Sequence, residues 1–273
     1  MTAVQTRAAQ APKPSPAARA HDVLAFEWTK LRSVRSTSIT LLIAAVVTIG
    51  ATGIVAHAVA STPKPPPGGF SALSVSFLAY AEYTVIPVSV LAVLQFTSEY
   101  SSGLIRTTFA AVPQRWTVLS GKAAVVGAAA LVIGEVLAFG CFALVQAILS
   151  GRHRGVSLGQ PGVLGAVLAA GFVLCACACA LTALGLAAIV RHTAGAITAA
   201  LAVIYLVAGL CFFLPSPWQA DIGRFTLAFA ASQVTALHPQ AGLFSPGGSM
   251  LVLVAWPAGT LLVAGLVITR RDA

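Results

Sequence analysis

Charged residues are scarce in this chain of 273 residues, since Asp, Glu, Lys and Arg together make up only 8% of it. Soluble domains carry roughly 25% charged residues, because their surfaces need polar cover. Hydrophobic residues instead make up 58% of the chain, and its mean hydropathy is +0.91. A soluble fold of this length cannot hide so much apolar surface. The composition therefore excludes a soluble domain and predicts an all-α integral membrane protein.

Acidic residues are the rarest charged ones, with seven Asp and Glu against sixteen Lys and Arg, so that the net charge is +9. The basic residues stand mainly at the ends of apolar runs, which is typical of membrane topology. No basic stripe is interleaved with aromatic residues, so we expect no nucleic-acid partner.

Metal-binding and disulfide patterns are missing. All five cysteines lie inside apolar runs, so no disulfide framework is visible. Cys175, Cys177 and Cys179 alternate with alanine, and residues two apart on a helix point in different directions. We therefore expect no metal site.

Catalytic motifs are missing too, with neither a Gly-x-Ser-x-Gly elbow nor a His-Glu-x-x-His pair. The nearest approach to a Walker A sequence is Gly121-Lys122, but Trp116 stands where its first glycine belongs and Ala123 follows the lysine. The chain is not expected to be an enzyme or to hold a cofactor. No segment of this chain has the pattern that cradles the phosphates of ATP and holds its Mg²⁺.

The first twenty residues lack an apolar core and are rich in Ala, Pro, Gln and Ser. They do not form a secretory signal, which needs such a core. We interpret residues 1–20 as a disordered cytoplasmic tail and residues 21–273 as one membrane domain.

Long apolar runs dominate the rest of the chain. A spanning helix needs about 20 mostly apolar residues, and six runs qualify, at residues 39–60, 74–96, 118–149, 163–190, 194–214 and 250–269. Between the last two lies a long loop that contains a shorter apolar stretch, residues 225–237. That stretch is too short to span, so we predict six transmembrane helices and a re-entrant or interfacial segment before the last one.

Lysine and arginine positions set the orientation. With a cytoplasmic N-terminus, the inner group has nine members: Lys30, Arg32, Arg35, Arg106, Arg115, Lys122, Arg191, Arg270 and Arg271. The outer group has four: Lys64, Arg152, Arg154 and Arg224. This excess predicts that both termini are cytoplasmic.

Residues 21–35 precede the first span and have an amphipathic helical pattern. At 100° per residue one broad arc is apolar and is made by Val23, Leu24, Trp28, Leu31 and Val34. Lys30 and Arg32 lie off this arc, although Glu27 and Arg35 intrude on it. We predict an interfacial helix with Trp28 at headgroup level and the basic residues near anionic lipid. The alternative is that residues 21–35 are an ordinary basic segment that flanks and anchors the first span.

The loop at residues 97–117 is the most specific part of the sequence. It begins with an acid, Glu99, at a membrane exit. A helix-compatible stretch follows, with Leu104, Ile105 and Phe109 as apolar contacts, and Pro113 is placed to end it. A short helix that presents these residues is suited to docking into a groove of a partner.

This loop resembles the first cytoplasmic loop of ABC-2 type transporter permeases, through the pattern Glu99-Tyr100-x-x-Gly103-x-Ile105-Arg106-Thr107-Thr108…Pro113-x-Arg115. The segment before the first span is similar to the pre-membrane helix of bacterial members, through Glu27-Trp28-Thr29-Lys30-Leu31-Arg32-Ser33. The six-span layout and the long last outer loop also match. The resemblance covers roughly residues 22–271.

The resemblance implies a bacterial plasma-membrane exporter subunit that pairs with a second permease copy or paralogue. Each permease would dock a cytoplasmic ABC ATPase through a coupling helix. The residues carried over to that helix or beside it are Glu99, Gly103, Leu104, Ile105, Arg106 and Thr107. A plainer alternative is that Glu99 and Arg106 only cap and solvate a loop.

Two acids fall inside predicted spans. Glu135 lies deep in the third span and Glu82 in the outer half of the second. A charge at mid-bilayer is costly, so each is a candidate for the substrate path or for an interhelical hydrogen bond. A stripe of small residues, which lets another helix approach, is formed by Ala123, Gly127, Ala130, Gly134 and Ala138.

Two other functions stay open at this stage. One is a six-span secondary transporter or intramembrane enzyme that uses Glu135 and Glu82. The other is a membrane scaffold that binds a cytoplasmic partner through residues 97–117. Dependence on a separate ATPase distinguishes the exporter from both. Nothing in the sequence selects a transported substrate.

Overall fold

The computed structural model describes residues 16–33, 35–62, 72–112, 114–151, 155–237, 240 and 242–271. All regular secondary structure in these residues is helical, which confirms the all-α prediction. Four helical segments are long and apolar enough to cross a membrane, namely Thr37–Ser61, Arg115–Ser150, Thr193–Cys211 and Pro246–Arg270. The chain is therefore a multi-pass membrane protein. The two other predicted spans are helical as well.

The helices follow one another with short connections. In chain order they are α1 (Pro16–Ser33), α2 (Arg35–Ser61), α3 (Ala72–Ser102), α4 (Leu104–Ala111), α5 (Arg115–Ser150), α6 (Val163–Ala170), the π-helix η1 (Gly171–Ala180), α7 (Leu181–Val190), α8 (Thr193–Leu201), the π-helix η2 (Ala202–Leu206), α9 (Val207–Cys211), α10 (Ser216–Gly223), α11 (Leu227–Thr235) and α12 (Pro246–Arg271). Helices are the favoured solution because apolar surroundings offer the backbone no other hydrogen-bond partners.

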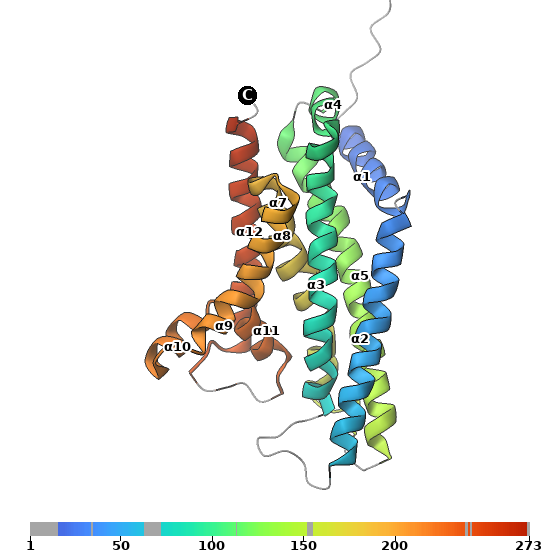
Figure 1. Cartoon of the computed structure of the whole chain (residues 1–273), viewed down its shortest axis with the longest axis vertical. Helices are drawn as coiled ribbons and strands as arrows, with labels where there is room; N and C mark the ends of the chain where they lie inside the picture. The colour runs from blue at the N-terminus through green and yellow to red at the C-terminus, as the bar shows by residue number, and fades with distance from the viewer. Residues whose placement is uncertain are drawn as a thin grey trace, which may run out of the picture.

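The long helices form two groups (Figure 1). The first comprises α2, α3 and α5, which pack on one another, and the second comprises α7, α8 and α12. Contacts of α3 with α7 and of α5 with η1 join the groups. The short helix α4 lies at one end of the bundle, together with α1, the start of α5 and the end of α12 (Figure 1). We call this the α4 end.

Two helical runs change register in their middle, which the hydropathy pattern did not predict. η1 separates α6 from α7, and η2 separates α8 from α9. A π-helix bonds residue i to i+5, and it occurs most often where tertiary contacts or function demand it. Apolar residues are compatible with both the α-helical and the π-helical hydrogen-bond register, so the composition does not predict where one replaces the other.

The stripe of small residues on α5 packs inside the chain. Ala130, Gly134 and Ala138 are buried, and a Cβ on Gly127 would lie 3.5 Å from Leu181. The helical run that approaches this stripe is therefore η1 and α7 of the same chain.

The short apolar segment before the last helix forms α11, which has nine residues. Thr226 caps it by accepting a hydrogen bond from the backbone N–H of Phe229. One face of α11 packs against α12 and α6, and buries Leu227 and Ala230. A re-entrant position for α11 stays a prediction.

The packing of α7 on α12 depends on Gly185. A Cβ there would lie 2.7 Å from both Cβ and Oγ1 of Thr260, and 2.9 Å from its carbonyl carbon. We expect Gly185→Ala to lower the free energy of unfolding by about 1–3 kcal/mol, as overpacking typically does. A Cβ on Gly140 meets nothing within 4 Å, so Gly140→Ala is the matched control. Melting temperatures of the purified proteins in detergent test this, and equal values for the two variants would contradict it.

Candidate functional site

A single residue, Gly103, separates α3 from α4. Its φ of 74° lies in the left-handed region that glycine adopts readily, and its N–H donates to the carbonyl of Tyr100. An added Cβ would meet nothing within 4 Å, so the requirement is one of backbone conformation and not of space. Gly103 therefore sets the direction in which α4 leaves α3.

The residues of α4 divide into an outer and an inner face. Leu104 is 54% exposed, and Arg106 and Thr107 are exposed beside it. Ile105 is only 7% exposed, and Phe109 packs partly buried against the core. Leu104, Ile105 and Phe109 were predicted to contact a partner together, and this grouping is wrong. Ile105 and Phe109 anchor α4 to the bundle, and Leu104 faces outward.

Glu99 does not face outward either. It lies in the last turns of α3 and is 2% exposed. Its Oε1 accepts hydrogen bonds from Nζ of Lys30, at 2.6 Å, and from Nζ of Lys122, at 2.5 Å. Its Oε2 is buried and has no hydrogen-bond partner in the described part of the chain. This burial contradicts the alternative in which Glu99 only caps and solvates a loop, and its place beside a coupling helix stays a prediction.

Lys122 connects Glu99 to α1. It is 0% exposed, and its Nζ also lies 2.6 Å from Oε1 of Glu27, which is 3% exposed. The four residues Glu27, Lys30, Glu99 and Lys122 form what we call the buried ionic network. It joins α1, α3 and α5 beneath α4, and its two carboxylates balance its two ammonium groups.

Close packing of α1 on α5 makes this network possible. A Cβ on Gly121 would lie 2.5 Å from Cγ1 of Val23, so the glycine allows α1 to reach α5 one residue before Lys122. Gly121 and Lys122 are the nearest approach to a Walker A sequence in this chain. In the structure, Gly121 allows the helices to pack closely and Lys122 pairs with buried carboxylates. A lysine inside an apolar run was the signal that could have identified this network.

Burial governs the ionisation of the two network members on α1. Burial raises the pKa of Glu27 above its ordinary value, against the opposing attraction of Lys122. Burial lowers the pKa of Lys30, and the neighbouring charge of Lys122 lowers it further. Desolvation thus outweighs pairing at both groups, as is common for buried ion pairs.

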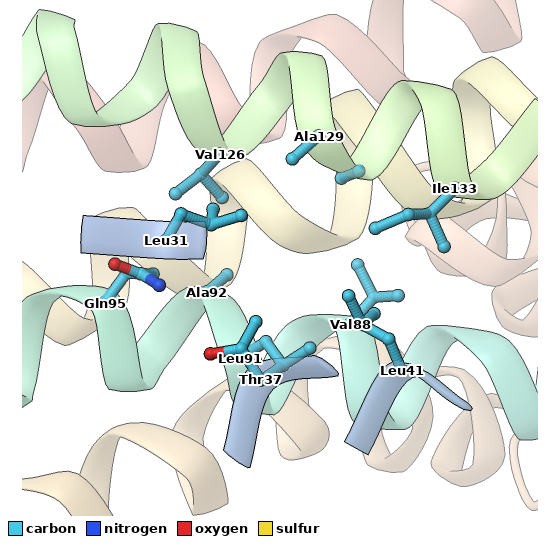
Figure 2. Close-up of a pocket in the computed structure, with 11 residues that line it drawn as sticks. Leu31, Thr37, Leu41, Val88, Leu91, Ala92, Gln95, Val126, Ala129 and Ile133 are labelled. Atoms are coloured by element: carbon cyan, nitrogen blue, oxygen red, sulfur yellow. The ribbon is translucent and has the colours of Figure 1, made fainter. Parts of the chain in front are cut away.

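A small, mostly apolar cavity lies between α1, α2, α3 and α5 (Figure 2). Leu31 of α1 points toward Val126 of α5, and Gln95 of α3 lies beside them. The cavity they help to line has a volume of about 30 Å³, and Thr37 and Gln95 are its only polar residues among the described ones. The backbone carbonyl of Gln95 also accepts a hydrogen bond from Lys30.

The helix predicted at residues 21–35 is formed as α1, but its faces differ from the prediction. Trp28 is exposed, and the guanidinium of Arg32 lies 6.0 Å from its ring centroid. Lys30 points inward to Glu99 and not to lipid headgroups. Leu31 faces the bundle, and Val34 lies outside the described residues. The position of α1 on a membrane surface stays a prediction.

A groove of about 460 Å³ runs between α1 and α4. Its lining comes from both helices and from the start of α5: Asp22, Val23, Phe26, Glu27, Leu104, Thr107, Thr108, Ala111, Val112 and Val118. Glu27 belongs to both the groove and the network, so a partner seated in the groove would lie against the buried charges.

Glu135 lies apart from this site. Glu135 is thirteen residues along α5 from Lys122, or about 20 Å at 1.5 Å per residue. The side chain of Glu82 lies outside the described residues, as does Pro113 at the end of α4. Among the described residues, no cluster of three or more His, Cys, Asp or Glu could hold a metal ion.

A family model described as ABC-2 family transporter protein matches residues 23–209. The matched segment contains α4 and all four members of the buried ionic network, and it ends before α10. The comparison with curated proteins found no match.

Removing the central cation should be severely destabilising. Lys122→Met leaves two buried carboxylates with Lys30 alone, and breaking a buried pair costs about 3–5 kcal/mol. The double variant Glu27→Gln with Lys122→Met removes one charge of each sign and should recover most of that loss. Arg106→Met, on the exposed face of α4, is the control and should stay within about 0.5 kcal/mol of wild type. Denaturation in detergent measures all three, and a Lys122→Met protein as stable as the control would refute the network's importance.

The raised pKa of Glu27 predicts a pH dependence of stability. Between its ordinary value of 4.5 and the raised pKa, the folded state binds more protons than the unfolded state, so stability falls as pH rises through this window. Glu27→Gln should flatten that fall. Asp22→Asn, at an exposed carboxylate of the same helix, should retain it. Melting temperature against pH checks the sign, and equal slopes for wild type and Glu27→Gln would contradict the prediction.

Proposed function

Since the chain belongs to the ABC-2 family of transporter proteins, we propose that it is the membrane subunit of an ATP-driven exporter, driven through α4 by a separate ATPase. Family membership makes the chain a permease component of an ABC transporter, a membrane transport component that is generally not catalytic itself. The proposal adds the direction of transport, the docking surface and the pairing of subunits.

The observation that carries the proposal is the two-sided character of α4. Its outer face offers Leu104, Arg106 and Thr107, while Ile105 holds its inner face on the bundle. A docking helix needs both features, because it must contact a partner and also transmit force. The groove between α1 and α4 lies beside the outer face and provides room for a side chain or a helix of the ATPase.

The buried ionic network supports a path for that force. Gly103 alone links α4 to α3, so displacement of α4 acts directly on the last turn of α3. Glu99 in that turn is bonded to Lys30 on α1 and to Lys122 on α5. We propose that these three helices move as one unit when the ATPase pair closes, and that the movement opens an export path.

Six membrane crossings fit the helix lengths. Besides the four apolar segments, α3 has 31 residues, or about 46 Å, and the run from α6 to α7 is of similar length. Either exceeds the roughly 30 Å hydrocarbon core of a bilayer. With six crossings, both termini and the α4 end face the cytoplasm of a bacterial cell. Of the predicted inner cations, Lys30 and Arg32 lie on α1, Arg106 on α4, Arg115 at the start of α5 and Arg270 near the end of α12, all elements of that end.

The partners in this proposal are an ABC ATPase that binds ATP and Mg²⁺, a second permease copy or paralogue, the lipid bilayer and a transported substrate. The chain itself holds no cofactor. A second candidate function is secondary transport or intramembrane catalysis through Glu135 and Glu82, and it is favoured by one observation: a carboxyl oxygen of Glu135 is buried without a hydrogen-bond partner in the described structure.

Copurification tests the docking surface. We expect Leu104→Asp to reduce the amount of P-loop ATPase that coelutes with the tagged permease at least tenfold, because it places a charge on an exposed apolar contact. Leu158→Asp makes the same change at an exposed leucine outside α4 and should leave the ATPase bound. Melting temperatures of both variants should match wild type.

Two results would count against the proposal. An ATPase that coelutes equally with Leu104→Asp and wild type would remove α4 as the docking surface. No ATPase in any sample, under mild detergent conditions that preserve a known transporter complex, would remove ATP-driven transport and favour the candidate based on Glu135.

A further inference from the structure

Glu135 lies in the middle of α5, twenty residues after its start at Arg115 and fifteen before its end at Ser150. It is partly buried. On one side of it Val132 and Val136 are exposed, while on the other the helix face is buried in the bundle. The carboxyl group therefore stands at the boundary between the apolar surroundings and the protein interior.

The carboxyl packs against the first residue of η1. A Cβ on Gly171 would lie 2.5 Å from Cδ and 2.6 Å from Oε2 of Glu135, so only glycine leaves room for the group. The backbone N–H of Phe172 donates a hydrogen bond to the carboxyl. Oε2 is buried and accepts no hydrogen bond in the described part of the chain.

A tyrosine hydroxyl stands at the same helix crossing. The OH of Tyr80 lies 3.2 Å from the carbonyl oxygen of Gly134 and 3.4 Å from that of Ala170. These residues directly precede Glu135 and Gly171, and Tyr80 is 0% exposed. Tyr80 of α3 and Glu135 of α5 thus both lie where the hydrogen-bond register of the fourth helical run changes, and such changes often mark functional positions.

No cation balances this carboxyl among the described side chains. Of the elements packed on α5, α6 has no titratable residue, and α2 and α12 have theirs near their ends. α3 contributes Tyr80, η1 contributes Cys179, and α5 itself carries Cys141. The nearest lysine along α5 is Lys122, about 20 Å away in the buried ionic network, to which α1 contributes Glu27 and Lys30.

From this geometry we propose that Glu135 is a proton-binding site in the membrane interior. A carboxylate without a counter-ion is costly in hydrocarbon, whereas a neutral carboxyl is tolerated. A proton on Oε2 makes the group neutral, so that the buried carboxyl no longer needs a counter-ion. The site takes a proton as its ligand, and it does not depend on docking of an ATPase to α4.

A lipophilic carbodiimide is a direct probe of such a site. Dicyclohexylcarbodiimide takes the acid proton on its nitrogen while the carboxylate oxygen attacks its central carbon, and the adduct then rearranges to a stable N-acylurea. The net change is the addition of one carbodiimide to the carboxyl. The full-length protein in liposomes would be treated at several pH values and its peptides analysed by mass spectrometry.

We expect the adduct on Glu135 in wild type, less of it as pH rises, and none at this position in Glu135→Gln. A charged, water-soluble carbodiimide should modify Glu135 at least tenfold less in the same liposomes. Protein unfolded in detergent at acidic pH is the control for reactivity and peptide detection. The proposal is overturned if Glu135 stays unmodified in the liposomes at every pH, or if both reagents modify it equally.

A second measurement separates proton binding from simple packing. Glutamine has the shape of a neutral glutamic acid, so Glu135→Gln should melt within a few degrees of wild type. Gly171→Ala displaces the carboxyl from η1 and should change the pH profile of carbodiimide labelling at Glu135. An unchanged profile would show that the contact with η1 does not govern the proton, and a large drop in melting temperature for Glu135→Gln would show that the native group is ionised.

Discussion

The ammonium group of Lys122 is the constraint on which the α4 end of this permease depends. A fully buried lysine must be paired, and here it is paired with Glu27 and Glu99 from two different helices. That requirement holds α1 against α5. The close approach of these two helices in turn requires a glycine, Gly121, at their crossing. It also turns Glu99 inward, so the last turn of α3 is held while α4 remains free to meet a partner.

The sequence predicted much of this architecture because apolar length and helical period are local properties. The helices and the helical form of the segment before the first span follow from runs of residues. The family also could be identified from the motif that includes Gly103, whose left-handed conformation explains why that residue type is required there.

The contacts that carry the candidate site were not predictable in the same way. Glu27 and Lys122 are 95 residues apart, and no local sequence feature of either residue predicts that the other is its partner. Ile105 and Leu104 are both apolar, and only tertiary packing decides which one is buried. The π segments follow the same rule, because the register of a helix in apolar surroundings is set by what it packs against and not by its own residues.

The balance of charge within the buried ionic network bears on how the transporter responds to voltage. Two carboxylates and two ammonium groups sum to zero when all are ionised, and they are held within contact distance of one another. An electric field does work only on net charge that moves along it. If α1, α3 and α5 shift together as proposed, this cluster would carry no net charge across the membrane while its four groups are ionised, and the membrane potential would do no work on it.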